Sequence, residues 1–213
     1  LAALADVLRA RNVWIILDEI YAELFYDGVA APSLLQVAPD LRERTLIVDG
    51  VSKTYAMTGF RVGWLLAPRA VAQACEKLQS QCTTSIATLS QLAALAALSG
   101  EQESVAQMRE AYRERRDVLV AGLAGISGIV CQKPRGAFYA FADVRGLYGR
   151  SGAGRRLQTD VDVGEWLLET ARVAGVPGTA FGGEGYVRFS YAAGLAELRE
   201  AIERIRAEVG SLT

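Results

Sequence analysis

The chain has 213 residues, 51% of them hydrophobic, and a net charge of −1. This length allows one substantial core or two modest ones, and the balanced charge provides no basic face for nucleic acid. No apolar run is long enough to span a bilayer, and the opening residues LAALADVLRA do not resemble a signal peptide. The absence of histidine excludes mechanisms built on a histidine base and most metal sites. We therefore expect no nucleic-acid, membrane or metal partner.

The cysteines indicate the cellular compartment of the chain, and its first residue indicates that it is part of a longer protein. Cys75, Cys82 and Cys131 are odd in number and contain no CxxC pair, which favours a reducing cytoplasm over a disulfide scaffold or a structural zinc site. Leu1 starts the chain inside a pattern typical of a helix. We interpret the chain as the C-terminal part of a longer protein.

The first hundred residues alternate between helical and strand-like patterns. Residues 1–10 have apolar residues at helical spacing, and helical segments recur at 69–80 and 86–99. Between them lie continuous apolar runs that suit strands buried on both faces, namely VWIIL (13–17), TLIVDG (45–50) and RVGWLLA (61–67). This alternation predicts an α/β layer architecture.

The second half begins with one long amphipathic helix, 101–124, which suits a connector between domains. The elements predicted after it are strands at 129–133 and 137–144, a Gly/Arg-rich loop at 145–160, a helix around 162–174, a strand at 185–191 and a terminal helix. They predict a smaller α+β unit. The GRSGAG stretch in the loop does not join a strand to a helix, so we predict a surface loop rather than a phosphate site.

Polar residues follow two of the predicted strands. In open α/β sheets, ligands collect at the carboxyl ends of the strands. Those ends carry DEIY (18–21) and DGVSK (49–53), so we expect Asp18, Tyr21 and Lys53 to converge, with Arg61 opening the next strand. An acid, a phenol, an amine and a guanidinium suit a ligand with a ring nitrogen, a phenolate, a carbonyl and a phosphate. Pyridoxal phosphate has all four groups.

Four segments together resemble the class I/II pyridoxal-phosphate aminotransferases: DEIYAELFYDG, VSKTYAMTGFRVGW, PRGAFYAFADV and VPGTAFGGEGYVRFSYA. The likeness extends over nearly the whole chain and is strongest to the bacterial aspartate-aminotransferase-like branch. It implies an α/β fold in which residues 1–100 form the C-terminal part of the large domain, a mostly parallel sheet with flanking helices. Residues 101–124 would be the connecting helix and 125–213 the small α+β C-terminal domain.

The resemblance implies a role for each residue that binds the cofactor. Lys53 would form the Schiff base and then move protons, a task for which a lysine amine is suited in a buried site. Asp18 would keep the pyridine nitrogen protonated, so that the ring acts as an electron sink. Tyr21 would hydrogen-bond the phenolate oxygen, Arg61 would clamp the phosphate, and the Ser52 hydroxyl would add a weaker contact to the phosphate.

Two further positions follow from the same resemblance. Arg188 lies where the family binds the α-carboxylate of the substrate, which suits the planar fork of an arginine. Tyr191, nearby, is interpreted as a packing residue. Many relatives carry a serine three residues before the lysine, but this chain has Gly50, so we expect the phosphate to depend more on Arg61 and on the backbone.

The function implied is amino-group transfer between an L-amino acid and a 2-oxo acid. Two alternatives stay open: a pyridoxal-phosphate lyase or decarboxylase of the same fold, and the aminotransferase-like sensor domain of a transcription regulator. Relatives are homodimers, and residues 80–85 (SQCTTS) would approach the partner's site. Because the other half would supply much of the pocket, we expect the chain alone to be poorly active.

Overall fold

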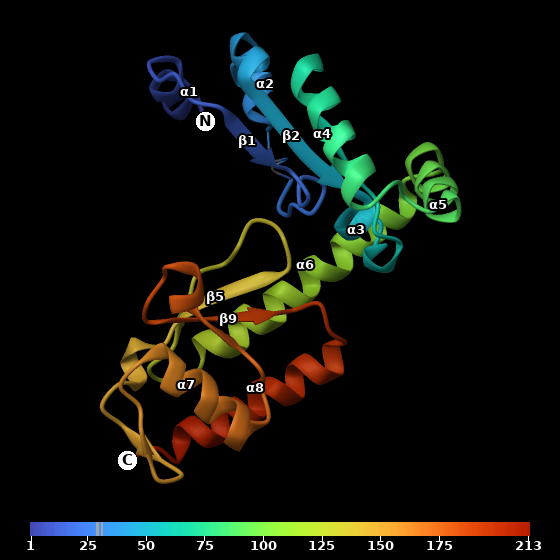
Figure 1. Cartoon of the computed structure of the whole chain (residues 1–213). Helices are drawn as coiled ribbons and strands as arrows, with labels where there is room; N and C mark the ends of the chain where they lie inside the picture. The colour runs from blue at the N-terminus through green and yellow to red at the C-terminus, as the bar shows by residue number, and fades with distance from the viewer. Residues whose placement is uncertain (29, 31) are drawn as a thin grey trace. The chain divides into compact units, whose positions relative to one another are not determined.

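The computed structural model describes residues 1–28, 30 and 32–213, in two compact units, Leu1–Gln107 and Met108–Thr213. The boundary lies inside helix α6 (Glu103–Ala124), the predicted connector. Figure 1 shows the order of the elements along the chain. Among the described residues, no helix has the length and apolar character needed to cross a bilayer.

A three-stranded sheet of order β1-β2-β3 organises the first unit. β1 (Ile15–Asp18) pairs in parallel with β2 (Thr45–Gly50), whereas β3 (Gly63–Leu66) runs antiparallel to β2. The sequence predicts all three strands but not the direction of the third. The segment between β2 and β3 contains only a four-residue helix and a short 3₁₀ turn, so no crossover helix returns the chain to the starting edge.

The core of this unit forms where α1 (Ala2–Arg9) and α2 (Leu34–Val37) pack against β1. Its buried members are Ala5, Ile15, Leu34, Ala38 and Leu41. Two hydrogen bonds from Arg9 to Asp40, of 2.8 and 2.9 Å, join α1 to the 3₁₀ turn Pro39–Arg44 on the surface. The helix predicted at 1–10 is thus present, whereas α2 is too short to be read from a periodic pattern.

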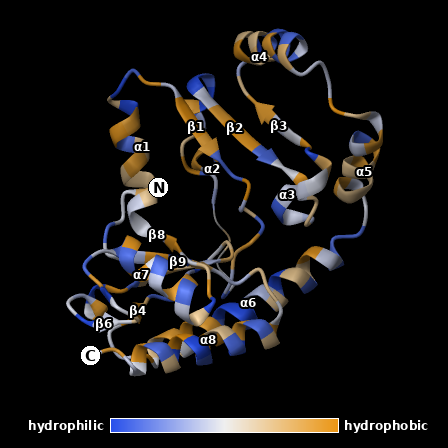
Figure 2. Cartoon of the chain, turned by 60° about the horizontal axis from the view of Figure 1, so that its bottom comes forward, coloured by the Kyte–Doolittle hydropathy of each residue, from blue (hydrophilic) through white to orange (hydrophobic). Residues whose placement is uncertain are grey.

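Part of the apolar surface of the first unit is exposed within the described chain. Figure 2 shows hydrophobic residues along β1 and β3, yet Ile16 of β1 is 68% exposed, so the predicted burial of that strand on both faces does not occur in this chain. The helices α4 (Arg69–Cys82) and α5 (Thr88–Ser99) also expose large apolar side chains, namely Leu78, Leu89, Leu92, Leu95 and Leu98. Residues 80–85 include the end of α4.

The second unit contains a four-stranded antiparallel sheet of order β4-β5-β9-β8. The strands are β4 (Val130–Cys131), β5 (Tyr139–Asp143), β8 (Val176–Pro177) and β9 (Tyr186–Ser190). One face of the sheet buries apolar residues, namely Ala140, Ala142, Val187 and Phe189. Because neighbouring residues of a strand alternate between faces, the other face carries Tyr139, Phe141 and Arg188.

Two helices complete this unit. α7 (Asp160–Trp166) continues into a π-helical turn, Leu167–Ala171, and α8 (Leu195–Gly210) ends the fold. Figure 2 shows α8 with alternating hydrophilic and hydrophobic bands, as expected of an amphipathic helix. Its apolar stripe is buried: Leu198, Ile202, Ile205 and Val209. The Gly/Arg-rich loop forms a small hairpin from β6 (Ser151–Gly152) and β7 (Arg155–Arg156).

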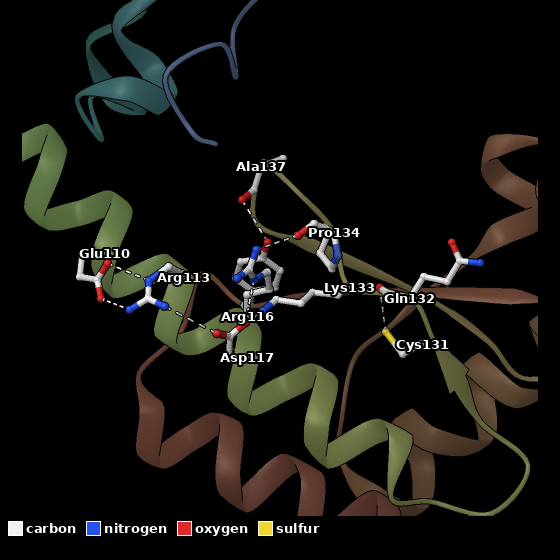
Figure 3. A network of polar contacts seen from close by, with 10 residues as sticks. Glu110, Arg113, Arg116, Asp117, Cys131, Gln132, Lys133, Pro134 and Ala137 are labelled. Carbon is white, nitrogen blue, oxygen red and sulfur yellow. Dashed lines mark hydrogen bonds and ion pairs between the residues drawn. The ribbon is translucent and has the colours of Figure 1, made fainter. Parts of the chain in front are cut away.

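A fully buried arginine holds the loop that leads into β5. Arg116 of α6 is 0% exposed; its Nε donates to Asp117 Oδ1 at 2.9 Å and its Nη1 to the carbonyl oxygen of Pro134 at 3.1 Å (Figure 3). Lys133 contacts the same Asp117 oxygen at 3.0 Å. A buried guanidinium is costly unless it is paired. The network pairs it and links α6 to the Pro134 backbone and the Lys133 side chain.

A second buried charge holds the turn before β9. Asp160, the first residue of α7, is 1% exposed and accepts hydrogen bonds from the backbone N–H of Thr179 at 2.7 Å and from its hydroxyl at 2.8 Å. Burial acts to raise the pKa of the Asp160 carboxyl, but hydrogen bonds, those from Thr179 foremost, together outweigh burial, and the pKa lies below its usual value. The 3₁₀ turn Gly178–Phe181 is thereby anchored to α7.

Replacing Arg116 with alanine is expected to lower the free energy of unfolding of the second unit by about 2–4 kcal/mol, because it leaves a cavity and removes the donor to the Pro134 carbonyl oxygen. The measurement is urea unfolding followed by the fluorescence of buried Trp166, with Trp14 and Trp64 replaced by phenylalanine. Arg113→Ala is the matched control, since Arg113 pairs with Glu110 on the surface and its loss is expected to cost about 0–1 kcal/mol. Equal costs for the two variants would contradict a structural role for Arg116.

Candidate active site

The first unit presents Asp18 at the carboxyl end of β1. Asp18 is the last residue of the strand and lies opposite Val48 of β2. The N–H of Glu19 donates to the Val48 carbonyl oxygen at 2.9 Å, so the pairing continues one residue past the strand. The Oδ1 atom of Asp18 accepts from the N–H of Ile20 at 3.3 Å. The Asp18 carboxylate is therefore exposed, while strand pairing with β2 holds the backbone at residues 18 and 19.

Lys53 lies on a short helix that begins directly after β2. This helix, α3, spans Val51–Thr54 and buries Val51 and Thr54, which leaves Ser52 and Lys53 half-buried. The Lys53 Nζ atom lies 6.0 Å from the centroid of the Tyr21 ring, over its face. The structure thus brings Tyr21 and Lys53 together, as the sequence predicts, although four residues carry no periodicity from which the helix could be predicted.

Gly50, where many relatives carry a serine, has a packing reason in this chain. A Cβ atom added there would lie 2.8 Å from the Val62 carbonyl oxygen and 3.0 Å from Gly63 Cα. Both contacts are with backbone, so they could be relieved only by moving β3 away from β2. In this chain the close approach of β3 leaves no room for a side chain at residue 50, so none from that position contributes to a phosphate site.

Arg61 precedes β3 with an unusual backbone conformation. Its φ of +57° is left-handed, as is the φ of +53° at Ala56, and non-glycine residues adopt this region only at some cost in energy. Arg61 Nη1 donates to the Thr58 carbonyl oxygen at 3.0 Å. Within the described part of the chain no acid pairs with Arg61, so its exposed guanidinium can accept an anion.

Asp49 is a residue to which the sequence analysis gave no role. Its Oδ1 accepts from the Gly50 N–H at 2.6 Å, which fixes the end of β2 just before α3. Burial raises the pKa of the Asp49 carboxyl, and the charges of Glu19, Glu23 and Asp18 add to this, against the Gly50 hydrogen bond. Glu19, Glu23 and Asp18 therefore lie near enough to Asp49 to act on its carboxyl group.

The second unit contributes Arg188, in the middle of β9. Its guanidinium carbon lies 4.3 Å from the centroid of the Tyr139 ring and 4.1 Å from that of Phe181. Arg188 is half-buried, and no carboxylate pairs with it among residues 1–28, 30 and 32–213. Tyr191 is fully buried, and its hydroxyl donates to the Ala137 carbonyl oxygen at 3.1 Å, which fits the predicted packing role.

The predicted site residues thus lie in two groups. Asp18, Tyr21, Ser52, Lys53 and Arg61 all belong to the first unit, at the carboxyl ends of β1 and β2 or in the segment between β2 and β3. Arg188 belongs to the second unit. The two flanking rings, Tyr139 and Phe181, are additional candidate residues; their motifs were visible in the sequence, but their contact with Arg188 depends on the fold.

Comparisons with known proteins identify the family of the chain. The family described as "Aminotransferase class I and II" matches residues 1–205. The aspartate aminotransferase of Rhizobium meliloti (strain 1021) is 44% identical over 97% of this chain and 51% of its own length. The aspartate/prephenate aminotransferase of Nitrosomonas europaea is 43% identical over 96% of this chain and 52% of its own length. The chain therefore spans about half the length of these curated relatives.

Solved structures give the same result. The crystal structure of the aspartate aminotransferase from Rhizobium meliloti matches all of this chain and 55% of its own, with a TM-score of 0.95 and 42% identity. An aromatic aminotransferase from Pyrococcus horikoshii OT3 matches 96% of this chain and 53% of its own, with a TM-score of 0.86 and 38% identity. The predicted α/β fold is confirmed, and the chain belongs to the class I and II aminotransferase family.

Proposed function

We propose that the chain is the C-terminal half of a pyridoxal-phosphate-dependent aminotransferase, which moves an amino group between an L-amino acid and a 2-oxo acid. The observation that carries this proposal is the grouping of Tyr21 and Lys53, with Nζ 6.0 Å from the ring centroid, beside the strand end that presents Asp18. Because relatives named aspartate aminotransferase cover nearly the whole chain, L-aspartate is the first amino donor to test.

The residues of the first unit fit pyridoxal phosphate on chemical grounds. The cofactor presents an aldehyde, a protonatable ring nitrogen, a phenolate and a phosphate. The unit offers an amine at Lys53, a carboxylate at Asp18, a phenol at Tyr21 and a guanidinium at Arg61 that no described acid neutralises. Ser52 lies next to Lys53 on α3 and can add a hydroxyl to the phosphate.

When bound, the cofactor supplies an electron sink for the amino acid's carbanion. The protein's residues do the rest. Asp18, whose carboxylate accepts the Ile20 N–H at the strand end, would hold a proton on the ring nitrogen. Tyr21 would donate a hydrogen bond to the ring oxygen, and Arg61 would bind the phosphate through its fork of N–H donors. Lys53 would hold the cofactor through its amine and would carry a proton at Nζ during the reaction.

Arg188 would bind the α-carboxylate of the substrate. Support comes from the half-buried guanidinium, which has no carboxylate partner among the described residues. A planar carboxylate accepts two parallel N–H bonds from such a fork. Binding energy at the carboxylate would orient the substrate amine and thereby raise the rate of the reaction at the Cα atom.

The exposed apolar surface of the first unit supports the proposal that the chain functions within a larger assembly. Exposed leucines of α5, together with Trp14 before β1 and Ile16 in β1, leave large apolar side chains in contact with water. We propose that the remainder of a full-length enzyme and a second copy cover it, in a homodimer. The free cysteines Cys75, Cys82 and Cys131 are consistent with a reducing cytoplasm.

Incubation with pyridoxal phosphate followed by borohydride reduction is expected to label Lys53. The chain has only two other lysines, Lys77 and Lys133, and both are exposed, so they report non-specific labelling in the same sample. Peptide mass spectrometry should show the cofactor mass chiefly on Lys53, and Lys53→Ala should abolish that label. Equal labelling of the three lysines would sink the assignment.

Amino transfer itself is tested by a half-reaction in the full-length enzyme. L-Aspartate should convert the bound cofactor stoichiometrically to its amine form and release one oxaloacetate per site, which a lyase or a decarboxylase would not do. Lys53→Ala should slow this conversion by at least about 10³-fold, because proton transfer at the substrate carbon loses its acid–base group. Release of carbon dioxide without conversion of the cofactor would contradict transamination. The 213-residue chain alone should react far more slowly than the full-length enzyme.

A further inference from the structure

Arg188 is held by two aromatic rings that come from separate segments. The guanidinium carbon lies over the Tyr139 ring at 4.3 Å and over the Phe181 ring at 4.1 Å, within the distance at which a cation is attracted to an aromatic face. No described carboxylate competes for the guanidinium. Rings restrict its motion without neutralising its charge or occupying its N–H donors.

The strand pairing fixes the first ring. Phe141 of β5 lies directly opposite Arg188 of β9, and Tyr139 lies opposite Ser190. Tyr139 is two residues before Phe141, so it shares a face of the sheet with Arg188 and is its diagonal neighbour. Phe141 itself stacks on Tyr186, with ring centroids 4.8 Å apart and an interplanar angle of 3°. The two aromatic residues of β5 therefore have different partners.

An anchored turn fixes the second ring. Phe181 ends the 3₁₀ turn that starts at Gly178, where an added Cβ would lie 2.0 Å from the Gly183 carbonyl oxygen. The Gly183 N–H donates to the Gly178 carbonyl oxygen at 2.9 Å and closes the turn. The buried carboxylate of Asp160 holds Thr179 in the middle of it. Phe181 is nevertheless 50% exposed, so core burial alone does not explain its ring.

We propose that Tyr139 and Phe181 are positioning residues that hold the Arg188 guanidinium in the orientation that binds a carboxylate. This inference rests on the proposed carboxylate role of Arg188. A free arginine side chain loses rotamer freedom when it binds, and this loss weakens binding. The two rings restrict the Arg188 side chain before a ligand binds, so a carboxylate binds to a preorganised guanidinium.

The test uses the 213-residue chain labelled with ¹⁵N-arginine and observes the Nε–Hε signal of Arg188, assigned by its disappearance in Arg188→Lys. Succinate is the carboxylate probe and succinamide its neutral control. Phe181→Leu should shift the Arg188 signal, because the ring current is lost, and weaken succinate binding by about fivefold. Phe181→Tyr keeps a ring and should bind succinate within about twofold of the unsubstituted chain.

Phe141→Leu is the matched control, since Phe141 lies opposite Arg188 but stacks on Tyr186. It should leave both the Arg188 signal and succinate affinity nearly unchanged. Tyr139→Leu should act like Phe181→Leu, and Tyr139→Phe like the unsubstituted chain. Unchanged affinity in both leucine variants at positions 139 and 181, or an equal loss in Phe141→Leu, would overturn the proposal.

The same experiment separates this inference from the proposed function. If succinate produces no change at Arg188 in the unsubstituted chain, the carboxylate role fails and the inference fails with it, whereas cofactor labelling at Lys53 is unaffected. If Lys53 is not labelled but succinate binds in a ring-dependent way, the cofactor assignment fails and the positioning role stands.

Discussion

The parallel pairing of β1 with β2 is the interaction on which the candidate site depends. Because parallel strands end at the same edge of a sheet, this pairing brings the end of β1, with Asp18, beside the end of β2, from which the Lys53 helix starts. Gly50 allows β3 to approach β2 closely, and Asp49 fixes the backbone between β2 and α3. The chemistry of the site therefore depends on backbone hydrogen bonds and on one glycine as much as on the reactive side chains.

Much of this arrangement could be predicted from the sequence, since buried strands are continuous apolar runs and polar residues stand out where they end. β2 has the predicted bounds, and β1, β3, α4 and α5 lie close to theirs. α3 could not be predicted, because four residues have no period. The prediction that β1 is buried on both faces was wrong for this chain. Ile16 is exposed on β1, which lies at the edge of the described sheet. An apolar run indicates that a strand can be buried, but not that its cover belongs to the same chain.

In the second unit, sequence pattern and fold contribute differently. The motifs around Tyr139, Phe181 and Arg188 are visible in the sequence, but their contact requires the β5–β9 register and the turn that Asp160 holds. Buried charges perform similar tasks at two places, Asp160 on that turn and Arg116 on the loop before β5. The loop that Arg116 holds leads into β5, which carries Tyr139. The turn that Asp160 holds leads into β9, which carries Arg188. The family resemblance points to the arginine, and only the fold identifies what holds it.

The central claim is that the carboxyl ends of β1 and β2 hold pyridoxal phosphate with its phosphate at Arg61. The most direct measurement compares the affinity of the full-length enzyme for pyridoxal phosphate with its affinity for pyridoxal, which has no phosphate, before and after Arg61→Gln. The account predicts that this substitution weakens binding of pyridoxal phosphate by about tenfold or more and leaves binding of pyridoxal nearly unchanged, since a charge-assisted bond to phosphate is lost. Equal effects on the two compounds, or no effect on either, would contradict it.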